Sequence, residues 1–374
     1  MKKRPDIISV PKSLRLRTVM MERFKSLYKL LGDLETWTVK TELAGVNIVK
    51  PVYVTSLARS GTTIVSEMLS QHESTSNHCY GDFPGLFTPY WKNWIKQRQV
   101  IGAGTVIERA HQDRIEINNN SIEAFEEVFW MYFFDSIHQN GMAYSVSYHA
   151  DNAFNSYYIE HIKKLLLIKG GNRYLAKANY NSNRIEYILA LFPDAKFVVP
   201  IRHPINHIAS LNKQHGMFLL AASKNKSIDL QLATSGHFEF GNLREVIRFA
   251  DKDRASHIKN LFEQAQELTG WAEYWLYFYQ SIRALKQKSA QLNEAIKIIR
   301  YEDLCVNSSD SIDEILSHCE LDHSNSHELK AKYVKHLSPP DYYEASFSQQ
   351  QISNIMKITI PLAKEFGYDS ENYF

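Results

Sequence analysis

The residues best suited to chemistry in this chain lie in one turn near residue 60. An apolar run at 52–54 predicts a buried strand, and apolar side chains at helical spacing over 64–69 predict a helix. The turn between them ends with five consecutive residues: Arg59, Ser60, Gly61, Thr62 and Thr63. Backbone N–H groups at the start of a helix have no helical partner, and the helix dipole favours negative charge there. The turn therefore predicts a binding site for an anion.

The frame of this turn is that of the phosphate-binding loop G-x-x-x-x-G-K-[ST], with two differences. Ser56 replaces the first glycine, and Thr62 replaces the lysine that reaches the β- and γ-phosphates of a nucleoside triphosphate. The cation of the turn lies earlier, at Arg59. The turn is thus typical of a phosphate site, and the missing lysine argues against a nucleoside triphosphate as its ligand.

A second phosphate site is predicted where a later strand ends. Apolar residues over 195–201 predict a buried strand, Arg202 follows it, and Pro204 starts a new helix. Ser210 lies eight residues after Arg202, about two turns into that helix. An arginine at a strand end and a hydroxyl group on the next helix can hold one phosphate together, the guanidinium by two parallel donors.

Both sites require strands that run in the same direction, because ligands of parallel sheets bind beyond the carboxyl ends of the strands. Further strands are predicted at 173–178 and 295–300, with helices between them. This alternation predicts an α/β fold of three layers, a P-loop-like parallel sheet flanked by helices. We expect an N-terminal helical extension over residues 1–45 and one domain over residues 46–374. Residues 218–270 show no strand pattern and are predicted to form a helical insertion or lid.

Four stretches, in this order, resemble the sulfotransferases that use 3′-phosphoadenylyl sulfate (PAPS). They are Leu-Ala-Arg-Ser-Gly-Thr-Thr at 57–63, Phe-Pro-Asp-Ala-Lys-Phe-Val-Val-Pro-Ile-Arg-His-Pro at 192–204, Arg-Tyr-Glu-Asp-Leu at 300–304 and Leu-Ala-Lys-Glu-Phe-Gly-Tyr at 362–368. The resemblance implies that the turn from Arg59 to Thr63 binds the 5′-phosphosulfate and that Arg202 and Ser210 bind the 3′-phosphate. It also implies that no metal ion is needed. The chain departs from the family pattern at Ser56, usually glycine, and at His203, usually acidic.

The resemblance also implies roles in the reaction. Arg59 and Lys177 are expected to stabilise the charge that develops during transfer. Asp82 follows Gly81 and is the nearest match to a Gly-Glu pair whose glutamate is the general base in relatives, and His78 is the alternative base. Structural roles are the alternatives: Asp82 as a turn residue and Lys177 as a solvated residue of an edge strand.

Composition excludes several classes of ligand and partner. The 43 basic and 41 acidic residues nearly balance, so no overall field attracts the chain to nucleic acid. The three cysteines show no C-x-x-C spacing, which predicts a reducing, cytoplasmic setting. The pair His237 and Glu239 offers too few ligands for a metal ion and is predicted to belong to the lid.

The N-terminus is basic, but it lacks the apolar segment of a signal peptide. No stretch of the chain has the roughly 20 apolar residues of a membrane span. Residues 15–31 predict a basic amphipathic helix. We expect this helix to pack on the domain, and docking at a membrane surface is the alternative.

These features together predict a PAPS-dependent sulfotransferase, whose partner is an acceptor with a hydroxyl group, or an amine, on a carbohydrate, lipid or small metabolite. Two other functions stay open. An ATP-dependent phosphotransferase with a degenerate P-loop would need a carboxylate for magnesium, and Glu302 and Asp303 are the nearby candidates. A non-catalytic nucleotide-binding adaptor would keep the fold without the base.

Overall fold

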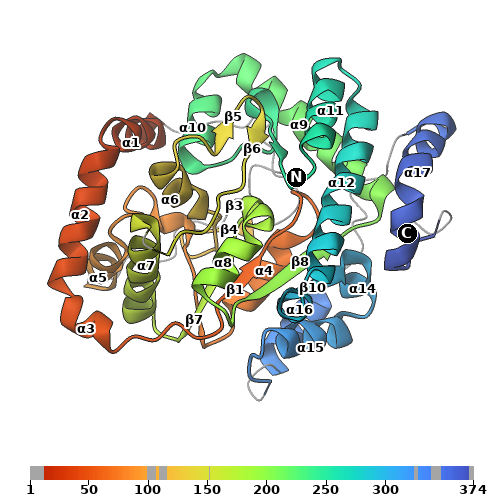
Figure 1. Ribbon diagram of the computed structural model, residues 1–374. Helices are drawn as coiled ribbons and strands as arrows, with labels where there is room; N and C mark the ends of the chain where they lie inside the picture. The colour runs from red at the N-terminus through yellow and green to blue at the C-terminus, as the bar shows by residue number, and fades with distance from the viewer. Residues whose placement is uncertain are drawn as a thin grey trace.

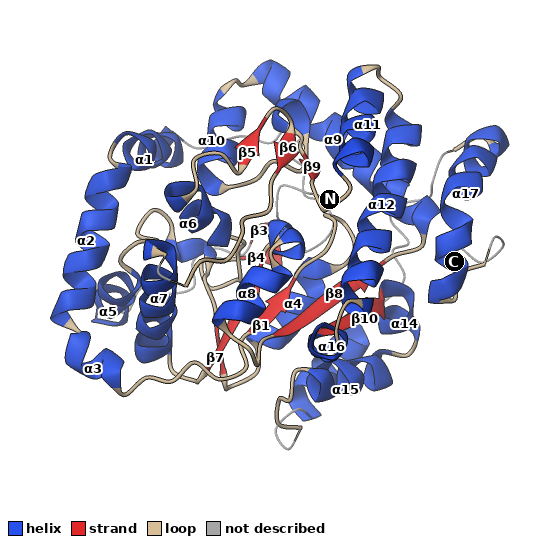
Figure 2. Ribbon diagram, in the orientation of Figure 1, coloured by secondary structure: helices blue, strands red, loops and turns tan. Residues whose placement is uncertain are grey.

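A parallel sheet of five strands lies at the centre of the protein (Figure 1, Figure 2). The computed structural model describes residues 12–98, 107–108, 116–150, 152–323, 327–337 and 347–369. The strands are β1 (Val52–Val54), β2 (Thr75–Ser76), β7 (Arg173–Lys177), β8 (Lys196–Ile201) and β10 (Ile296–Arg300), in the order β10-β8-β1-β7-β2. Every pairing in this sheet is parallel. The predicted α/β class is confirmed, as are the four strands expected from the apolar pattern.

The sheet is covered on both faces, because its side chains alternate between two separate apolar cores. Val52 and Val54 belong to one core, whereas Tyr53 between them belongs to the other. Leu175 and Val198, on the neighbouring strands, lie in the same core as Val52. All residues of β1 and β8 are buried. This burial is expected of a parallel sheet between two helical layers, and it confirms the three-layer arrangement.

The two helical layers come from different parts of the chain. One face of the sheet carries α4 (Thr62–Ser70), α15 (Ser308–His318) and α16 (His327–His336). The opposite face carries α6 (Glu126–Phe133), α7 (Ala153–Lys169), α8 (Ile185–Leu191), α9 (Pro204–Lys224), α12 (Glu267–Gln287) and α17 (Gln349–Ala363). In this second layer α12 packs against both α9 and α17. The helices that follow β1 and β8, α4 and α9, therefore both contribute side chains to the apolar cores.

The remaining elements surround these layers. The helices are α1 (Lys12–Arg23), α2 (Lys25–Thr38), α3 (Lys40–Ala44), α5 (Pro89–Arg98), α10 (Ser227–Ser235), α11 (Lys252–Glu263), α13 (Ala290–Ala295) and α14 (Tyr301–Val306). Short 3₁₀ turns are η1 (Tyr80–Asp82), η2 (Asn179–Asn183), η3 (Gly241–Leu243) and η4 (Lys364–Phe366). Two small sheets pair β3 (Ile107–Glu108) with β4 (Glu116–Ile117), and β6 (Met142–Ala143) with both β5 (His138–Gln139) and β9 (Val246–Ile247).

The segment at 218–270 differs from the predicted insertion in two respects. The helix α9 extends to Lys224, so the segment begins inside a core helix. The segment also contains β9, whose Val246 pairs in parallel with Met142 of β6. The expectation that no strand occurs here was wrong, because two residues are too few to show an alternating pattern. The segment also contains α10, η3 and α11, with loops between them, and its role as an insertion or lid stays a prediction.

The predicted N-terminal extension consists of α1, α2 and α3 in its described part, and residues 1–11 lie outside the described residues. Figure 1 shows these helices along one side of the molecule. The boundary at 45/46 stays a prediction. Among the described residues, no helix is long and apolar enough to cross a membrane.

Candidate functional site

The turn predicted to bind an anion joins β1 to α4 at the carboxyl edge of the sheet. Gly61 is the N-cap of α4 with a φ of +106°, and Arg59 has a φ of +68°. The N–H of Val65 donates to the carbonyl oxygen of Gly61 at 3.2 Å. The amides that precede Val65 at the start of α4 therefore lie outside the helical hydrogen-bond ladder. This is the geometry of an anion cradle at a helix N-terminus.

Gly61 is needed in the cradle for two reasons. Its positive φ is one that a residue with a Cβ rarely adopts, and a Cβ there would lie 2.6 Å from Cδ2 of Tyr301. Tyr301 follows β10, and its ring centre lies 5.3 Å from the guanidinium carbon of Arg202. The Tyr301 ring therefore contacts both predicted phosphate sites, the cradle at Gly61 and the guanidinium of Arg202.

Ser56 has a use that glycine could not supply. Its buried hydroxyl donates to the carbonyl oxygen of Pro200 at 2.7 Å and lies 3.1 Å from the hydroxyl of Tyr279. The Tyr279 hydroxyl also donates to Pro200 at 3.1 Å. The residue that departs from the P-loop frame therefore ties the entrance of the cradle to β8 and α12.

The two predicted phosphate sites meet through a direct hydrogen bond. Nε of Arg59 donates to Oγ of Ser210 at 3.1 Å, so the cradle contacts α9. Arg202 follows β8, and its carbonyl oxygen accepts from the indole N–H of Trp275 at 3.2 Å. Nε of Arg202 is buried and has no hydrogen-bond partner among the described residues. The site therefore holds a guanidinium donor that the protein itself does not use.

His203 and Glu302 hold the start of the helix that carries Ser210. The backbone N–H of His203 donates to Oε1 of Glu302 at 2.9 Å, and Nδ1 of the His203 ring accepts from the N–H of Ile205 at 3.3 Å. The hydroxyl of Tyr368 donates to Oε2 of Glu302 at 2.6 Å. Burial raises the pKa of Glu302 above its usual value, and these two hydrogen bonds oppose that shift. Both carboxylate oxygens of Glu302 are thus engaged within the protein.

Lys177 ends β7 in register with Val54 of β1, close to the entrance of the cradle. Its Nζ lies 3.9 Å from Oε1 of Glu123, and Nε2 of His237 lies 4.0 Å from the same oxygen. Nδ1 of His237 lies 3.5 Å from Oε2 of Glu239. We call these four residues the Lys177 cluster: Lys177, Glu123, His237 and Glu239.

Asn179 connects the Lys177 cluster to the cradle. Its side-chain amide donates to Oε1 of Glu239 at 2.9 Å, and its carbonyl oxygen accepts from Oγ1 of Thr55 at 3.1 Å. Thr55 directly precedes Ser56 in the chain. The cluster and the turn after β1 are therefore parts of one connected site.

Opposite charges decide the protonation of the Lys177 cluster. Burial opposes ionisation of Glu123, but the charges of Lys177 and His237 outweigh it and lower the pKa of Glu123. Burial likewise opposes protonation of His237, but the Glu239 carboxylate outweighs it and raises the pKa of His237. The His237 charge also lowers the pKa of Glu239, so both glutamates of the cluster are ionised at neutral pH, and Glu123 is the one that lies beside Lys177.

Sequence reasoning missed Glu123 and treated His237 and Glu239 as lid structure. The His-x-Glu spacing of His237 and Glu239 is visible in the sequence. Glu123, which lies beside His237 in the structure, is more than a hundred residues earlier in the chain. Glu123 stands outside every stretch that resembles the family, and nothing in its local pattern distinguishes it from a surface glutamate.

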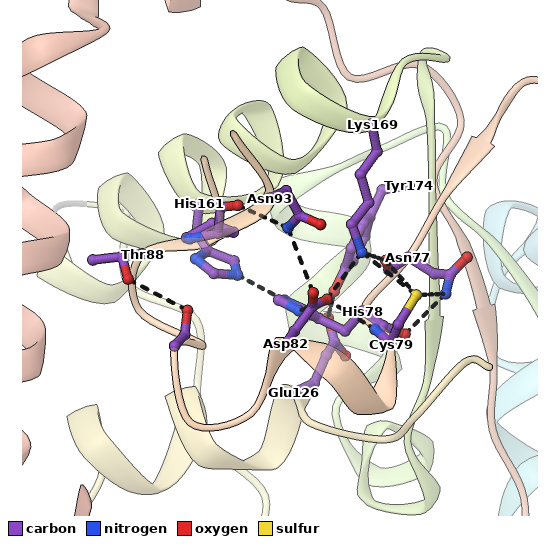
Figure 3. A network of polar contacts seen from close by, with 12 residues as sticks. Asn77, His78, Cys79, Asp82, Thr88, Asn93, Glu126, His161, Lys169 and Tyr174 are labelled. Atoms are coloured by element: carbon purple, nitrogen blue, oxygen red, sulfur yellow. Dashed lines mark hydrogen bonds and ion pairs between the residues drawn. The ribbon is translucent and has the colours of Figure 1, made fainter. Parts of the chain in front are cut away.

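Asp82 lies in a separate buried network, which Figure 3 shows. Its Oδ2 accepts from Nζ of Lys169 and from the N–H of Cys79, both at 2.9 Å. Its Oδ1 accepts from Nδ2 of Asn93 at 3.4 Å. Burial opposes ionisation of Asp82, but the hydrogen bond from His78 and the charge of Lys169 outweigh it and hold its pKa below the usual range. A base role for Asp82 stays a prediction, and its contacts are those of a carboxylate that holds η1 against α5 and α7.

His78, the alternative base, belongs to the same network. Its Nδ1 lies 3.3 Å from Oδ2 of Asp82, and its Nε2 lies 2.8 Å from Nε2 of His161. Burial lowers the pKa of both histidines. The carbonyl oxygen of His78 accepts from the N–H of Glu123 at 3.0 Å, so this network supports the backbone of the Lys177 cluster.

The comparison with protein families identifies the family of the chain. The family model described as the sulfotransferase family matches residues 51–239. This match is half of the chain, and it includes the cradle, Lys177, Arg202 and Ser210. The chain belongs to the sulfotransferase family. The resemblance found in the sequence is thereby confirmed.

Solved sulfotransferases are similar to this family member in fold. Sulfotransferase STF9 from Mycobacterium avium is 12% identical, with 90% of this chain and 82% of that chain covered and a TM-score of 0.50. Sulfotransferase STF1 from Mycobacterium tuberculosis H37Rv is 16% identical, with 91% and 86% covered and a TM-score of 0.47. A comparison with curated proteins finds no match. The likeness to the M. avium protein supports the P-loop-like fold.

Proposed function

We propose that this sulfotransferase moves a sulfuryl group from PAPS to a hydroxyl group, or an amine, of a carbohydrate, lipid or small-molecule acceptor. The observation that carries the proposal is the hydrogen bond between Arg59 and Ser210. It joins two phosphate sites at one sheet edge, as a donor with separate 5′- and 3′-phosphates requires.

The residues present fit such a donor. The cradle at Ser60 to Thr63 would hold the 5′-phosphate by backbone amides, next to the guanidinium of Arg59. The unpartnered Nε of Arg202 and the hydroxyl of Ser210 would hold the 3′-phosphate. Tyr301 limits the space above Gly61, so only backbone lines the cradle at that point.

The donor supplies a sulfuryl group bound to phosphate through a bridging oxygen. Transfer forms a bond from the acceptor oxygen to sulfur, breaks the bond from sulfur to the bridging oxygen, and releases adenosine 3′,5′-bisphosphate. Arg59 and Lys177 would stabilise the negative charge that develops during this exchange. The acceptor hydroxyl must lose a proton, and Glu123 is the ionised carboxylate beside Lys177 that would take it.

The structure gives less support to the two other functions. In a phosphotransferase, Glu302 or Asp303 would bind magnesium. However, Glu302 accepts hydrogen bonds on both carboxylate oxygens. Oδ1 of Asp303 lies 3.6 Å from Nη1 of Arg300, so this carboxylate is already paired with a cation. A non-catalytic adaptor has no use for the half-buried charges of the Lys177 cluster, whose assembly costs desolvation.

A titration and a transfer assay together distinguish the three functions. Calorimetry with adenosine 3′,5′-bisphosphate should show tight binding, and ATP with magnesium should bind far more weakly. No binding of the bisphosphate, or equal binding of both ligands, would overturn the proposal. Transfer of labelled sulfate from PAPS to a panel of sugars, lipids and phenols then separates an enzyme from an adaptor, because an adaptor binds the bisphosphate and transfers nothing.

A further inference from the structure

Helices α1 and α2 present a continuous run of apolar side chains to the outside of the molecule. Trp37 is 72% exposed, and Leu16 and Leu30 are each 62% exposed. We call the set the N-terminal apolar face: Leu16, Val19, Met20, Phe24, Leu27, Leu30, Leu31, Leu34 and Trp37. Scattered apolar residues are normal on a protein surface, but these nine recur at helical spacing from Leu16 to Trp37 and so gather along one side of each helix, which marks an interaction site.

The polarity of α2 is inverted relative to an ordinary surface helix. Its inner side buries Gly32 and Glu35, whereas its leucines lie outside. Nζ of Lys164 lies 2.9 Å from Oε2 of Glu35 and donates to the carbonyl oxygen of Gly32 at 3.0 Å. A Cβ on Gly32 would lie 2.6 Å from the carbonyl oxygen of Phe87. The helix is thus fixed to the protein by its polar side, which holds its apolar side outward.

Charge distinguishes this part of the chain from the rest. The first 44 residues contain ten basic and five acidic residues, a formal charge of +5, although the whole chain carries +2. The other 330 residues therefore carry −3. Arg15, Arg17 and Arg23 of α1 are exposed beside the N-terminal apolar face. The described part of this segment, residues 12–44, contains seven basic and four acidic residues, so a formal charge of +3 lies on the helices that carry the apolar side chains.

We propose that the N-terminal apolar face docks this protein on the surface of an anionic lipid bilayer. Leucine, phenylalanine and tryptophan side chains with flanking arginine and lysine are the combination that holds a helix in the headgroup region. Each basic residue near an anionic surface adds attraction. Docking is peripheral, because the face belongs to helices that lie along the protein.

A second copy of the chain fits this face less well. A two-fold dimer places the same patch against itself, so the exposed arginines of both copies would meet. Met20, Phe24, Leu27, Leu31 and Leu34 follow a 4-3-4-3 spacing, but the helix is interrupted at Phe24, where φ is −119° and ψ is 30°. A coiled coil requires such a pattern over three or four continuous heptads.

The test is flotation of the full chain with lipid vesicles. Vesicles of phosphatidylcholine alone are compared with vesicles that also contain phosphatidylglycerol, at low and high salt. We expect binding to the anionic vesicles, weakened by salt because the attraction is partly electrostatic. Absence of binding to the anionic vesicles would overturn the proposal.

Variants locate the docking surface. The double variant Leu30→Glu with Trp37→Glu should bind anionic vesicles at least about tenfold more weakly. The double variant Arg17→Glu with Arg23→Glu should lose most of the salt-dependent part of the vesicle affinity. The matched control is Val306→Glu with Val334→Glu, which adds the same two charges at exposed apolar residues of α14 and α16 and should bind like the wild type. Equal binding by all variants would overturn the proposal.

Light scattering identifies the competing occupant. If the wild type is a dimer that Leu30→Glu with Trp37→Glu dissociates, and no vesicle binds, the face is a dimer interface and the membrane proposal is wrong. Both substituted side chains are exposed, so circular dichroism and thermal unfolding should match the wild type. The result is independent of the donor, because vesicle binding is measured without PAPS.

Discussion

Nε of Arg59 donates a hydrogen bond of 3.1 Å to Oγ of Ser210, although the two residues are 151 positions apart in the chain. Arg59 belongs to the cradle after β1, and Ser210 belongs to the helix after β8. These strands are neighbours in the sheet, with Val54 paired to Val198. The parallel pairing places both strand ends at one edge, so two motifs that are separate in sequence form one site.

Removal of the Arg202 side chain should weaken donor binding. A charge-assisted hydrogen bond is worth about 1.5–3 kcal/mol, so Arg202→Ala should raise the Kd for adenosine 3′,5′-bisphosphate roughly 10- to 100-fold. Calorimetry measures this change. The control is Arg283→Ala, which removes a half-buried arginine of α12 paired with Glu365 and should leave the affinity unchanged. An unchanged Kd for Arg202→Ala would exclude Arg202 from the donor site.

Glu123 and Asp82 should respond differently when each loses its charge. Glu123→Gln keeps the shape of the side chain but cannot accept the acceptor proton, so kcat should fall about 100-fold or more with little change in donor affinity. Asp82→Asn should leave turnover near the wild-type value. Single-turnover sulfate transfer measures both. If Asp82→Asn slows transfer and Glu123→Gln does not, the base is Asp82.

Asp82→Asn should act on stability instead. Loss of the carboxylate leaves the ammonium group of Lys169 without its ion-pair partner, at a cost of about 3 kcal/mol. The folded-state pKa of Asp82 is depressed, so its contribution is present above the unfolded pKa and is lost as the pH falls through the folded value. Urea unfolding at pH 7 should therefore show a lower midpoint for Asp82→Asn. Equal midpoints would contradict the structural role.

The parts of this site that the sequence predicts are those with local patterns. Ser60, Gly61 and the strand before them are recognisable because a buried strand, a small-residue turn and an amphipathic helix follow within a few residues. Arg202 and Ser210 are recognisable because their spacing matches two helical turns. Glu123 was not, because its position depends on the fold of residues 118–125, which contain no regular helix or strand. The strand β9 was missed because two residues are too few to show an alternating pattern.

Ser56 also shows why a motif departure cannot be judged by sequence alone. The sequence shows that a serine replaces the first glycine, but the partners of its hydroxyl, Pro200 and Tyr279, come from β8 and α12. Their distance in the chain hides the contact. The local sequence determines the strand-turn-helix conformation of the motif, whereas tertiary packing determines how much its first residue, Ser56, contributes to stability.

Ser56→Gly restores the family pattern and should nevertheless destabilise this protein. The variant loses a buried hydrogen bond and gains backbone freedom, so the free energy of unfolding should fall by about 1–2 kcal/mol. A double-mutant cycle with Tyr279→Phe measures the coupling between the two hydroxyls, which should be about 0.5–1.5 kcal/mol. A more stable Ser56→Gly variant would show that the hydrogen bond contributes nothing.

Stability should also fall at alkaline pH because of His138. Its Nε2 lies 2.6 Å from Oε1 of Glu127 and its Nδ1 lies 2.5 Å from Oε2 of Glu245. Burial opposes protonation, but these two carboxylates outweigh it and raise the pKa of His138 to about 9. The His138 ring stacks on the ring of Phe238 with a centroid distance of 4.1 Å. Phe238 lies between His237 and Glu239 in the chain. The charge on His138 therefore stabilises the segment 237–239, which contains His237 and Glu239 of the Lys177 cluster.

The sign of this dependence follows from the raised pKa. The stabilising contribution is fully present below the unfolded pKa near 6.5 and is lost as the pH rises to about 9, with a total on the order of 3 kcal/mol. Urea unfolding between pH 6.5 and 9 should show a falling midpoint. His138→Asn cannot titrate, so its midpoint should be lower at pH 6.5 and should change less with pH. Parallel pH profiles for the two proteins would show that His138 does not hold its proton between these carboxylates.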